Sequence, residues 1–231
     1  MRFPDRRAAG RLLGRQLEEF AGRADVLVLA LPRGGVPVAC EIARTLAAPL
    51  DVFVVRKLGV PGQEELAMGA IATGGVRVLN GEVVRALEIS PDQIEEIAER
   101  EERERQRREL AYRGLRGFSE IEGRTVILVD DGLATGSTMR AAVAALRRLS
   151  PQQIVIAVPV GARSTCDSLA LDADRVVCLH SPPDLFSVGE WYADFAQTTD
   201  QEVRQLLEEA AQARAAAAEG RADRGKHDAA T

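Results

Sequence analysis

Apolar runs of strand length recur along the chain, and most are followed by a segment with helical spacing. The strand-like runs are residues 26–31, "DVFVVRK" at 51–57, residues 125–129, "QIVIAVPV" at 153–160 and "DRVVCL" at 174–179. Helical spacing follows at 36–46, 138–149 and 164–171. Continuous β-branched runs are typical of strands covered on both faces, and strands alternating with helices imply parallel pairing with right-handed crossovers. The pattern predicts an α/β fold, a twisted and mostly parallel β-sheet flanked by helices.

The segment between the second and third runs has a different pattern. "LGVPGQEE" at 58–65 predicts a mobile loop, and "MGAIATGGVRVLN" predicts a hairpin that turns at Gly74-Gly75. Ser90, Pro91 and Asp92 form a helix-start signal, with an N-cap and a proline at the first helical position. Glu–Arg pairs at i,i+4 and a small apolar face indicate an inserted, charged, solvent-facing helix at about 91–114.

Helical patterns also occur near both ends of the chain. Residues 12–20 predict a short amphipathic helix, and residues 201–218 predict a C-terminal helix. The small and charged residues at 219–231 predict a disordered tail. We expect a single domain over residues 1–218, made of a core at about 21–180, the inserted helix at about 91–114 and a small hood with the C-terminal segment at about 181–218.

Net charge and cysteine content exclude several classes of function. The net charge of −5 argues against a protein that binds duplex nucleic acid, but a local basic pocket for one phosphorylated ligand stays open. Cys40, Cys166 and Cys178 form no CxxC pair, which disfavours a zinc site and favours a reducing compartment. The N-terminus lacks the apolar stretch of a secretory signal, and no run approaches the ~20 residues that cross a bilayer. We expect a cytoplasmic, dimeric protein with small-molecule partners, and neither nucleic acid nor membrane.

The stretch "VILVDDGLATGSTM" at 126–139 carries the candidate chemistry. In a parallel sheet, ligands bind outside the carboxyl ends of the strands, where Asp130 and Asp131 fall. Two like charges in contact resist joint ionisation, so the pair is explained if it accepts hydrogen bonds from vicinal sugar hydroxyls near a divalent cation. Taken alone, Asp131-Gly132 would fit an ordinary turn equally well.

The loop after the acids is suited to an anion. Gly132 and Gly136 permit a tight or left-handed backbone, so several N–H groups converge at the start of a helix. Thr135, Ser137 and Thr138 add hydroxyl donors, although a simple helix cap would also use them. A ribose site beside a phosphate site describes a ribose 5-phosphate pocket. It is not a Walker A loop, because no lysine precedes the hydroxyl residues.

This stretch resembles the phosphoribosyl-pyrophosphate signature of type I phosphoribosyltransferases, and the resemblance extends over roughly residues 25 to 200. It implies their fold, with a Rossmann-like core, and it implies that Asp130 and Asp131 hold the ribose 2- and 3-hydroxyls. The implied 5-phosphate site comprises Gly132, Ala134, Thr135, Gly136, Ser137 and Thr138. The segment "LGVPGQEELAMGA" resembles the corresponding segment of a bacterial subgroup whose members are usually described only as predicted phosphoribosyltransferases.

The resemblance also implies a pyrophosphate loop. "LALPRGGVPVA" has the matching strand–loop–helix context, which gives this role to Arg33, Gly34 and Gly35. Arg56 and Lys57 end the second run, where cations that neutralise pyrophosphate lie in similar enzymes; a pair of solvated charges is the alternative. Residues 58–65 would be the flexible flap. On it, Glu64 or Glu65 would supply general acid or base help, unless these acids only aid solubility.

The implied reaction displaces pyrophosphate from C1 of an activated ribose by a nitrogen nucleophile. Charge separates in its oxocarbenium-like transition state, so Mg²⁺ bound to phosphoribosyl pyrophosphate (PRPP) would act together with Arg33, Arg56 and Lys57. We expect no dedicated metal cage, with Asp130 or Asp131 as the candidate protein ligands. Ala134 occupies the position at which enzymes of this fold that use 6-oxopurines carry an acid. A loop without this acid resembles those of the adenine- and orotate-type enzymes instead.

Acceptor recognition is expected from the aromatic-rich "SPPDLFSVGEWYADFAQTTD". Trp191 and Tyr192 are the candidates to stack on a planar base, whereas packing of this segment onto the core is an equal alternative. His180 is interpreted as the end of the fifth run. The leading hypothesis is a phosphoribosyltransferase of nucleotide metabolism that acts on a nucleobase or related heterocycle. The alternatives are a non-catalytic regulatory protein that binds PRPP or a nucleotide, and an enzyme that hydrolyses or phosphorolyses a nucleotide.

Overall fold

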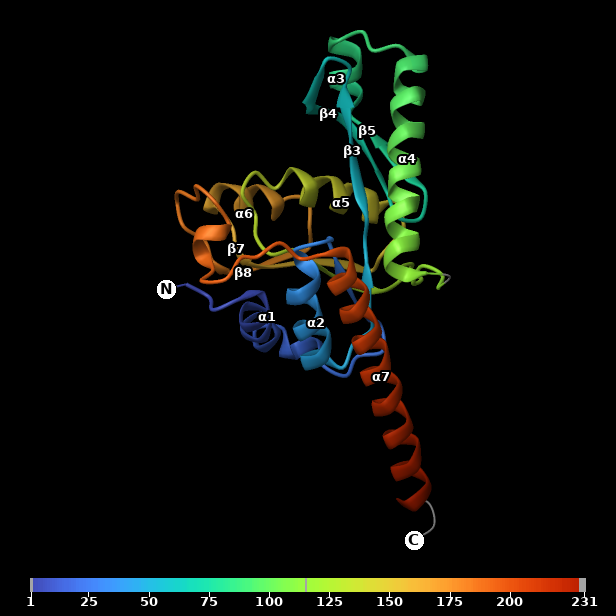
Figure 1. Ribbon diagram of the computed structural model, residues 1–231, viewed down its shortest axis with the longest axis vertical. Helices are drawn as coiled ribbons and strands as arrows, with labels where there is room; N and C mark the ends of the chain where they lie inside the picture. The colour runs from blue at the N-terminus through green and yellow to red at the C-terminus, as the bar shows by residue number, and fades with distance from the viewer. Residues whose placement is uncertain (1, 115, 229–231) are drawn as a thin grey trace.

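A five-stranded parallel sheet forms the centre of the computed structural model, which describes residues 2–114 and 116–228 (Figure 1). Its strand order is β2-β1-β6-β7-β8, and every neighbouring pair is parallel. The strands are β1 (Val26–Ala30), β2 (Leu50–Val52), β6 (Thr125–Val129), β7 (Gln153–Val160) and β8 (Arg175–His180). The α/β fold predicted from the apolar runs is confirmed.

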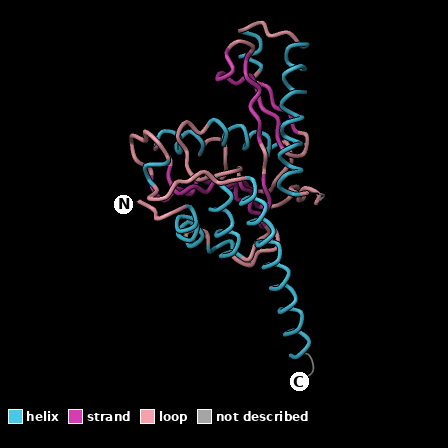
Figure 2. Tube along the Cα trace, viewed as in Figure 1, coloured by secondary structure: helices cyan, strands magenta, loops and turns pink. Residues whose placement is uncertain are grey.

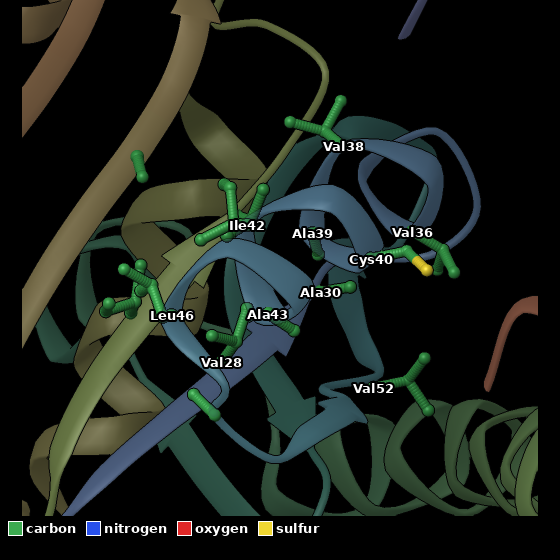
Figure 3. Packing of buried hydrophobic residues seen from close by; sticks show 14 of the residues in the cluster. Val28, Ala30, Val36, Val38, Ala39, Cys40, Ile42, Ala43, Leu46 and Val52 are labelled. Atoms are coloured by element: carbon green, nitrogen blue, oxygen red, sulfur yellow. The ribbon is translucent and has the colours of Figure 1, made fainter. Parts of the chain in front are cut away.

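Helices cover both faces of this sheet. On one face lie α1 (Arg6–Arg15), α2 (Gly35–Leu46) and α7 (Asp200–Asp228), and on the other lie α5 (Ser137–Arg147) and α6 (Arg163–Leu169). Val28 and Ala30 of β1 pack with Ala39 and Ala43 of α2 (Figure 3), whereas the alternate residues of β1 pack towards α5. Successive side chains of a strand point to opposite faces, so a strand covered on both sides must be apolar throughout.

An antiparallel unit projects from the central sheet (Figures 1 and 2). It consists of β3 (Val55–Val60), β4 (Gln63–Ala72), β5 (Val76–Leu79), α3 (Gly81–Ala86) and α4 (Pro91–Arg113). Leu58 and Met68 of this sheet are fully buried against apolar residues of α4, including Ile94 and Ile97. The projecting unit therefore has a small hydrophobic core of its own.

The inserted helix begins as predicted. Ser90 and Gln93 form a reciprocal capping box, with Pro91 at the first helical position. At the other end of α4, Arg113 donates to Asp51 of β2 over 2.7 Å, and both side chains are buried. This ion pair fixes the projecting unit to the central sheet.

Two predictions about this unit are wrong. The run at 51–57 is not one strand: β2 joins the parallel sheet and β3 joins the antiparallel one. The segment 58–65, predicted as a mobile loop, forms the ends of β3 and β4 around a turn at Pro61-Gly62. The apolar Leu58 and Val60 pack against α4, and this tertiary contact outweighs the local loop signal. The predicted hairpin turn at Gly74-Gly75 is confirmed, with φ of +85° and +71°.

The chain ends also differ from the prediction. The N-terminal helix is α1 (Arg6–Arg15), followed by the short 3₁₀ helix η1 (Glu18–Phe20), rather than one helix at 12–20. The carboxylate of Asp5 caps α1 by accepting from the amide of Ala8, a start signal that the apolar pattern obscured. At the other end, α7 continues to Asp228, beyond residue 218, where the predicted C-terminal helix ends and the predicted disordered tail begins. Residues 229–231 lie outside the described part. Within that part, no helix is both long and apolar enough to span a membrane.

Candidate active site

Two loops meet where β1 and β6 end. These strands are neighbours, with Ala30 opposite Val129, so the loops that follow them start at the same edge of the sheet. A Cβ atom at Gly34 would lie 2.0 Å from Oδ2 of Asp131, and one at Gly35 would lie 2.6 Å from the carbonyl oxygen of Val129. The structure thus brings the Arg33-Gly34-Gly35 loop into direct contact with the two acids. The absence of side chains on the glycines allows this approach.

The two carboxylates share a poorly solvated environment. The amide of Asp131 donates to Oδ1 of Asp130 over 2.9 Å. Burial raises the pKa of Asp130 well above its ordinary value, and the charge of Asp131 raises it further. Burial also raises the pKa of Asp131, although Arg6 opposes this rise. Carboxyl groups perturbed in this way are common where a protein binds cations or hydrogen-bond donors.

Arg6 is a site residue that the sequence reasoning missed. Its Nε donates to Oδ2 of Asp131 over 2.8 Å, and its Nη1 donates to the carbonyl oxygen of Ala196 over 2.8 Å. The guanidinium carbon lies 3.8 Å from the ring centroid of Phe195, a cation–π contact. Arg6 and Asp131 are 125 residues apart, so no local pattern could have linked them.

The predicted phosphate loop is held in place by hydrogen bonds to its neighbours. Leu133 donates its amide to Val160 over 2.8 Å and accepts from the amide of Ala162 over 3.0 Å. The hydroxyl of Thr165 donates to the carbonyl oxygen of Ala134 over 2.8 Å. Gly136 caps α5 with φ of +67°, in the left-handed region that glycine tolerates best.

The side chains of this loop remain accessible. Ala134, Thr135, Ser137 and Thr138 are exposed, and Ser137 is the first residue of α5. Partly free amides at a helix N-terminus, together with hydroxyl groups, suit a phosphate. Gly132 is shielded instead, since a Cβ there would lie 2.5 Å from Val188.

The three basic side chains predicted to lie near the pyrophosphate have different environments. Arg33, in the turn just before α2, is partly exposed, and its Nη1 lies 3.7 Å from Oδ1 of Asp200. Arg56 pairs with Glu101 of α4 through Nε at 2.8 Å and Nη2 at 2.6 Å. Lys57 has no ion-pair partner within residues 2–114 and 116–228. The charge of Arg56 is therefore engaged in holding α4 to β3, and its role beside pyrophosphate stays a prediction.

The predicted flap acids lie away from the two loops. Glu64 and Glu65 are exposed at the start of β4, beside the turn at the end of the projecting hairpin (Figure 1). Glu64 lines a small cavity against α4 that also includes Glu96 and Arg100. In this arrangement they are surface acids of the projecting unit, and the structure does not bring them to Asp130.

Two aromatic residues of the hood, Trp191 and Tyr192, pack onto the protein. Tyr192 is buried, its hydroxyl donates to the carbonyl oxygen of Asp131 over 2.6 Å, and its ring stacks on Phe195. Trp191 stacks on His180, the last residue of β8. For Tyr192 the packing alternative is correct and the base-stacking prediction is not, because burial leaves its ring no face for a ligand.

No three His, Cys, Asp or Glu side chains of the described residues form a metal cluster. The expected use of Asp130 or Asp131 with a substrate-borne Mg²⁺ stays a prediction. The Asp131 amide donates to Oδ1 of Asp130, which leaves the other oxygen of that carboxylate able to bind a cation. Such a site suits Mg²⁺, because most ligands of this ion are water molecules and substrate oxygens.

Comparison with known proteins places this geometry in a family. The model of the phosphoribosyl transferase domain family matches residues 6–190, which contain Arg6 and both loops. "Putative phosphoribosyl transferase Rv0571c" of Mycobacterium tuberculosis (strain ATCC 25618 / H37Rv) is 47% identical over 208 residues. The alignment covers 90% of this chain and 47% of the relative, and a second strain has a relative with the same values. The chain therefore spans about half the length of the curated relatives that it matches.

A solved structure is similar over nearly its whole length. The crystal structure of TT1426 from Thermus thermophilus has a TM-score of 0.82 and 42% sequence identity, and it covers 90% of this chain and 99% of that chain. The family match includes most of the chain, and the fold, the two-acid strand end and the neighbouring glycine loop agree with it. The chain belongs to the phosphoribosyl transferase domain family and has the type I phosphoribosyltransferase fold.

Proposed function

We propose that the protein transfers the 5-phosphoribosyl group from PRPP to a nitrogen nucleophile and releases pyrophosphate in an Mg²⁺-dependent reaction. The observation that carries the proposal is the contact between Gly34 and Asp131, since a Cβ at Gly34 would lie 2.0 Å from the Asp131 carboxylate. In PRPP the pyrophosphate is attached to C1, next to the ribose hydroxyls. An enzyme that cleaves this bond needs its sites for sugar and leaving group in contact.

Each loop has a distinct role in this proposal. Asp130 and Asp131 accept hydrogen bonds from the ribose hydroxyls, and residues 134–138 with the N-terminus of α5 bind the 5-phosphate. The amide of Gly35 donates to the carbonyl oxygen of Leu31 over 3.1 Å, so this glycine shapes the loop. Arg33 and the amide of Gly34 bind the pyrophosphate, with Lys57 as a further cation. Preorganised donors of this kind stabilise the negative charge that develops on the leaving group. Mg²⁺, held by the substrate and an Asp130 or Asp131 oxygen, would neutralise part of the same charge.

The acceptor in this proposal is a nucleobase or related heterocycle. Ala134 at the loop position that carries an acid in 6-oxopurine enzymes supports an acceptor other than hypoxanthine or guanine. A role in nucleotide metabolism, a cytoplasmic location and a homodimer belong to the same proposal. The alternative is a regulatory protein that binds PRPP without turnover. The contact between Gly34 and the largely buried Asp131 is compatible with a transferase and with such a regulatory protein.

The first test measures Mg²⁺-dependent PRPP binding by titration calorimetry for the wild-type chain, Asp130→Asn and Asp92→Asn. Asp92 is an exposed acid at the start of α4, so its substitution controls for the loss of one charge. Losing one charge-assisted hydrogen bond costs about 1.5–3 kcal/mol, so Asp130→Asn should bind PRPP about 10- to 100-fold more weakly. Asp92→Asn should bind like the wild type.

The second test adds a panel of nitrogen heterocycles and follows released pyrophosphate. Release with one acceptor, dependent on Asp130, supports the transferase. PRPP binding without release for any acceptor would favour the regulatory alternative. If the wild-type chain does not bind PRPP at all, the proposed function is wrong.

A further inference from the structure

Arg6 is enclosed by the site rather than lying on the surface. Its side chain is only 11% exposed and that of Asp131 only 16%. The pair therefore differs from exposed ion pairs, which contribute little to the stability of a protein. The Nε, the Nη1 and the face of the guanidinium are each used, by Asp131, Ala196 and Phe195 respectively. Three contacts on one guanidinium define its position, and they connect α1, the end of β6 and the hood.

Asp131 is surrounded by protein groups. Its Oδ2 accepts from Arg6 and is the same atom that approaches the backbone at Gly34 most closely. Its carbonyl oxygen accepts from the hydroxyl of Tyr192 over 2.6 Å. The contacts therefore come from the N-terminal helix, the pyrophosphate loop and the hood.

The neighbouring carboxylate differs. Within the described residues, the hydrogen bond to the Asp130 side chain is the one from the amide of Asp131, to Oδ1, and no ion pair includes Asp130. Asp130 therefore retains the capacity to accept hydrogen bonds from a ligand, whereas one oxygen of Asp131 is already committed.

We propose that Arg6 and Tyr192 are positioning residues that make Asp131 a structural anchor for the pyrophosphate loop and leave Asp130 as the main carboxylate for the ribose. This inference rests on the proposed function and divides its two acids into different roles. With Asp131 held between Arg6 and Gly34, the two loops keep the separation that PRPP requires. A shift of about 1 Å in such a site can reduce binding and turnover strongly.

The test compares Arg6→Gln and Arg6→Lys with the matched control Arg7→Gln. Arg7 is the next residue of α1, is 46% exposed and lies 3.9 Å from its nearest carboxylate, Glu41. Arg6→Gln should raise the Kd for Mg²⁺-PRPP about 10-fold or more. Arg6→Lys should recover part of the loss, because it keeps the charge but lacks the planar fork that reaches Asp131 and Ala196 together. Arg7→Gln should match the wild type.

A double-mutant cycle separates positioning from direct contact. If Arg6 acts through Asp131, the Arg6→Gln/Asp131→Asn double variant should lose little more affinity than Asp131→Asn alone. Additive losses would mean that Arg6 contacts the substrate itself and would overturn the assignment. The proposal also requires Asp130→Asn to lose more affinity than Asp131→Asn, and the reverse order would refute it.

The outcomes distinguish this inference from the proposed function. A wild-type chain that does not bind PRPP refutes the function and with it the inference. A wild-type chain that binds PRPP, with Arg6→Gln unchanged in affinity, refutes the inference alone. If Arg6→Gln does not fold, Tyr192→Phe decides, since it removes only the hydroxyl that binds the Asp131 carbonyl. Unchanged PRPP affinity in Tyr192→Phe would overturn the proposal.

Discussion

Substitution of Gly34 by alanine tests the contact between the two loops. The backbone of Gly34 has φ of −61° and ψ of −32°, which alanine adopts readily, so only the added methyl matters. This methyl would lie 2.0 Å from Oδ2 and 2.6 Å from Cγ of Asp131. To reach the 3.4 Å at which ordinary contact begins, the methyl and Oδ2 must separate by 1.4 Å. Asp131 has little freedom to move, because Arg6 holds the same oxygen.

The expected cost follows from this overlap. Forcing extra volume into a packed site costs about 1–3 kcal/mol. For a chain of this length, that corresponds to a fall in Tm of roughly 2–12 °C. Because the displaced groups belong to the proposed sugar and pyrophosphate sites, PRPP affinity should fall by about 10-fold or more, a larger loss than global destabilisation of a folded protein would cause.

Gly117→Ala is the matched control. A Cβ there would meet nothing within 4 Å, so its stability should stay within about 0.5 kcal/mol of the wild type and its PRPP affinity should not change. Thermal unfolding and titration calorimetry on the three proteins are sufficient. If Gly34→Ala matches Gly117→Ala in both Tm and PRPP affinity, the loops are not in functional contact and the reasoning is wrong.

Two further predictions concern stability. Arg113→Met leaves the buried Asp51 without its cation and should cost about 3–5 kcal/mol in urea unfolding. Arg103→Met removes an exposed pair that spans 3.9 Å on the same helix and should cost less than about 1 kcal/mol, and equal costs would contradict the anchoring role. The hydrogen bond from Arg23 lowers the pKa of Asp25 to about 2, so its stabilisation is present above pH ~4 and is lost as pH falls towards 2. The stability deficit of Asp25→Asn should therefore shrink over that window, and a constant deficit would refute this assignment.

The sequence by itself determined the central sheet and the two loops at its edge. Apolar runs such as Thr125–Val129 are long enough to identify strands covered on both faces, and they match the observed burial. Asp130-Asp131 and Arg33-Gly34-Gly35 directly follow such runs. Their proximity could be anticipated because parallel strands end at one edge of a sheet, and the neighbouring positions of β1 and β6 confirmed it.

The tertiary structure decided the rest of the site. Local pattern predicted a loop at 58–65, but packing of Leu58 and Val60 on α4 made it a hairpin, and Arg56 was engaged by Glu101 of that helix. Tyr192 became part of the packing, and Arg6 reached Asp131 across 125 residues of sequence. Periodicity records which side chains are buried, because burial follows the local geometry of a strand or helix. It does not record which distant partner a charged side chain meets, since only the folded chain brings the two together.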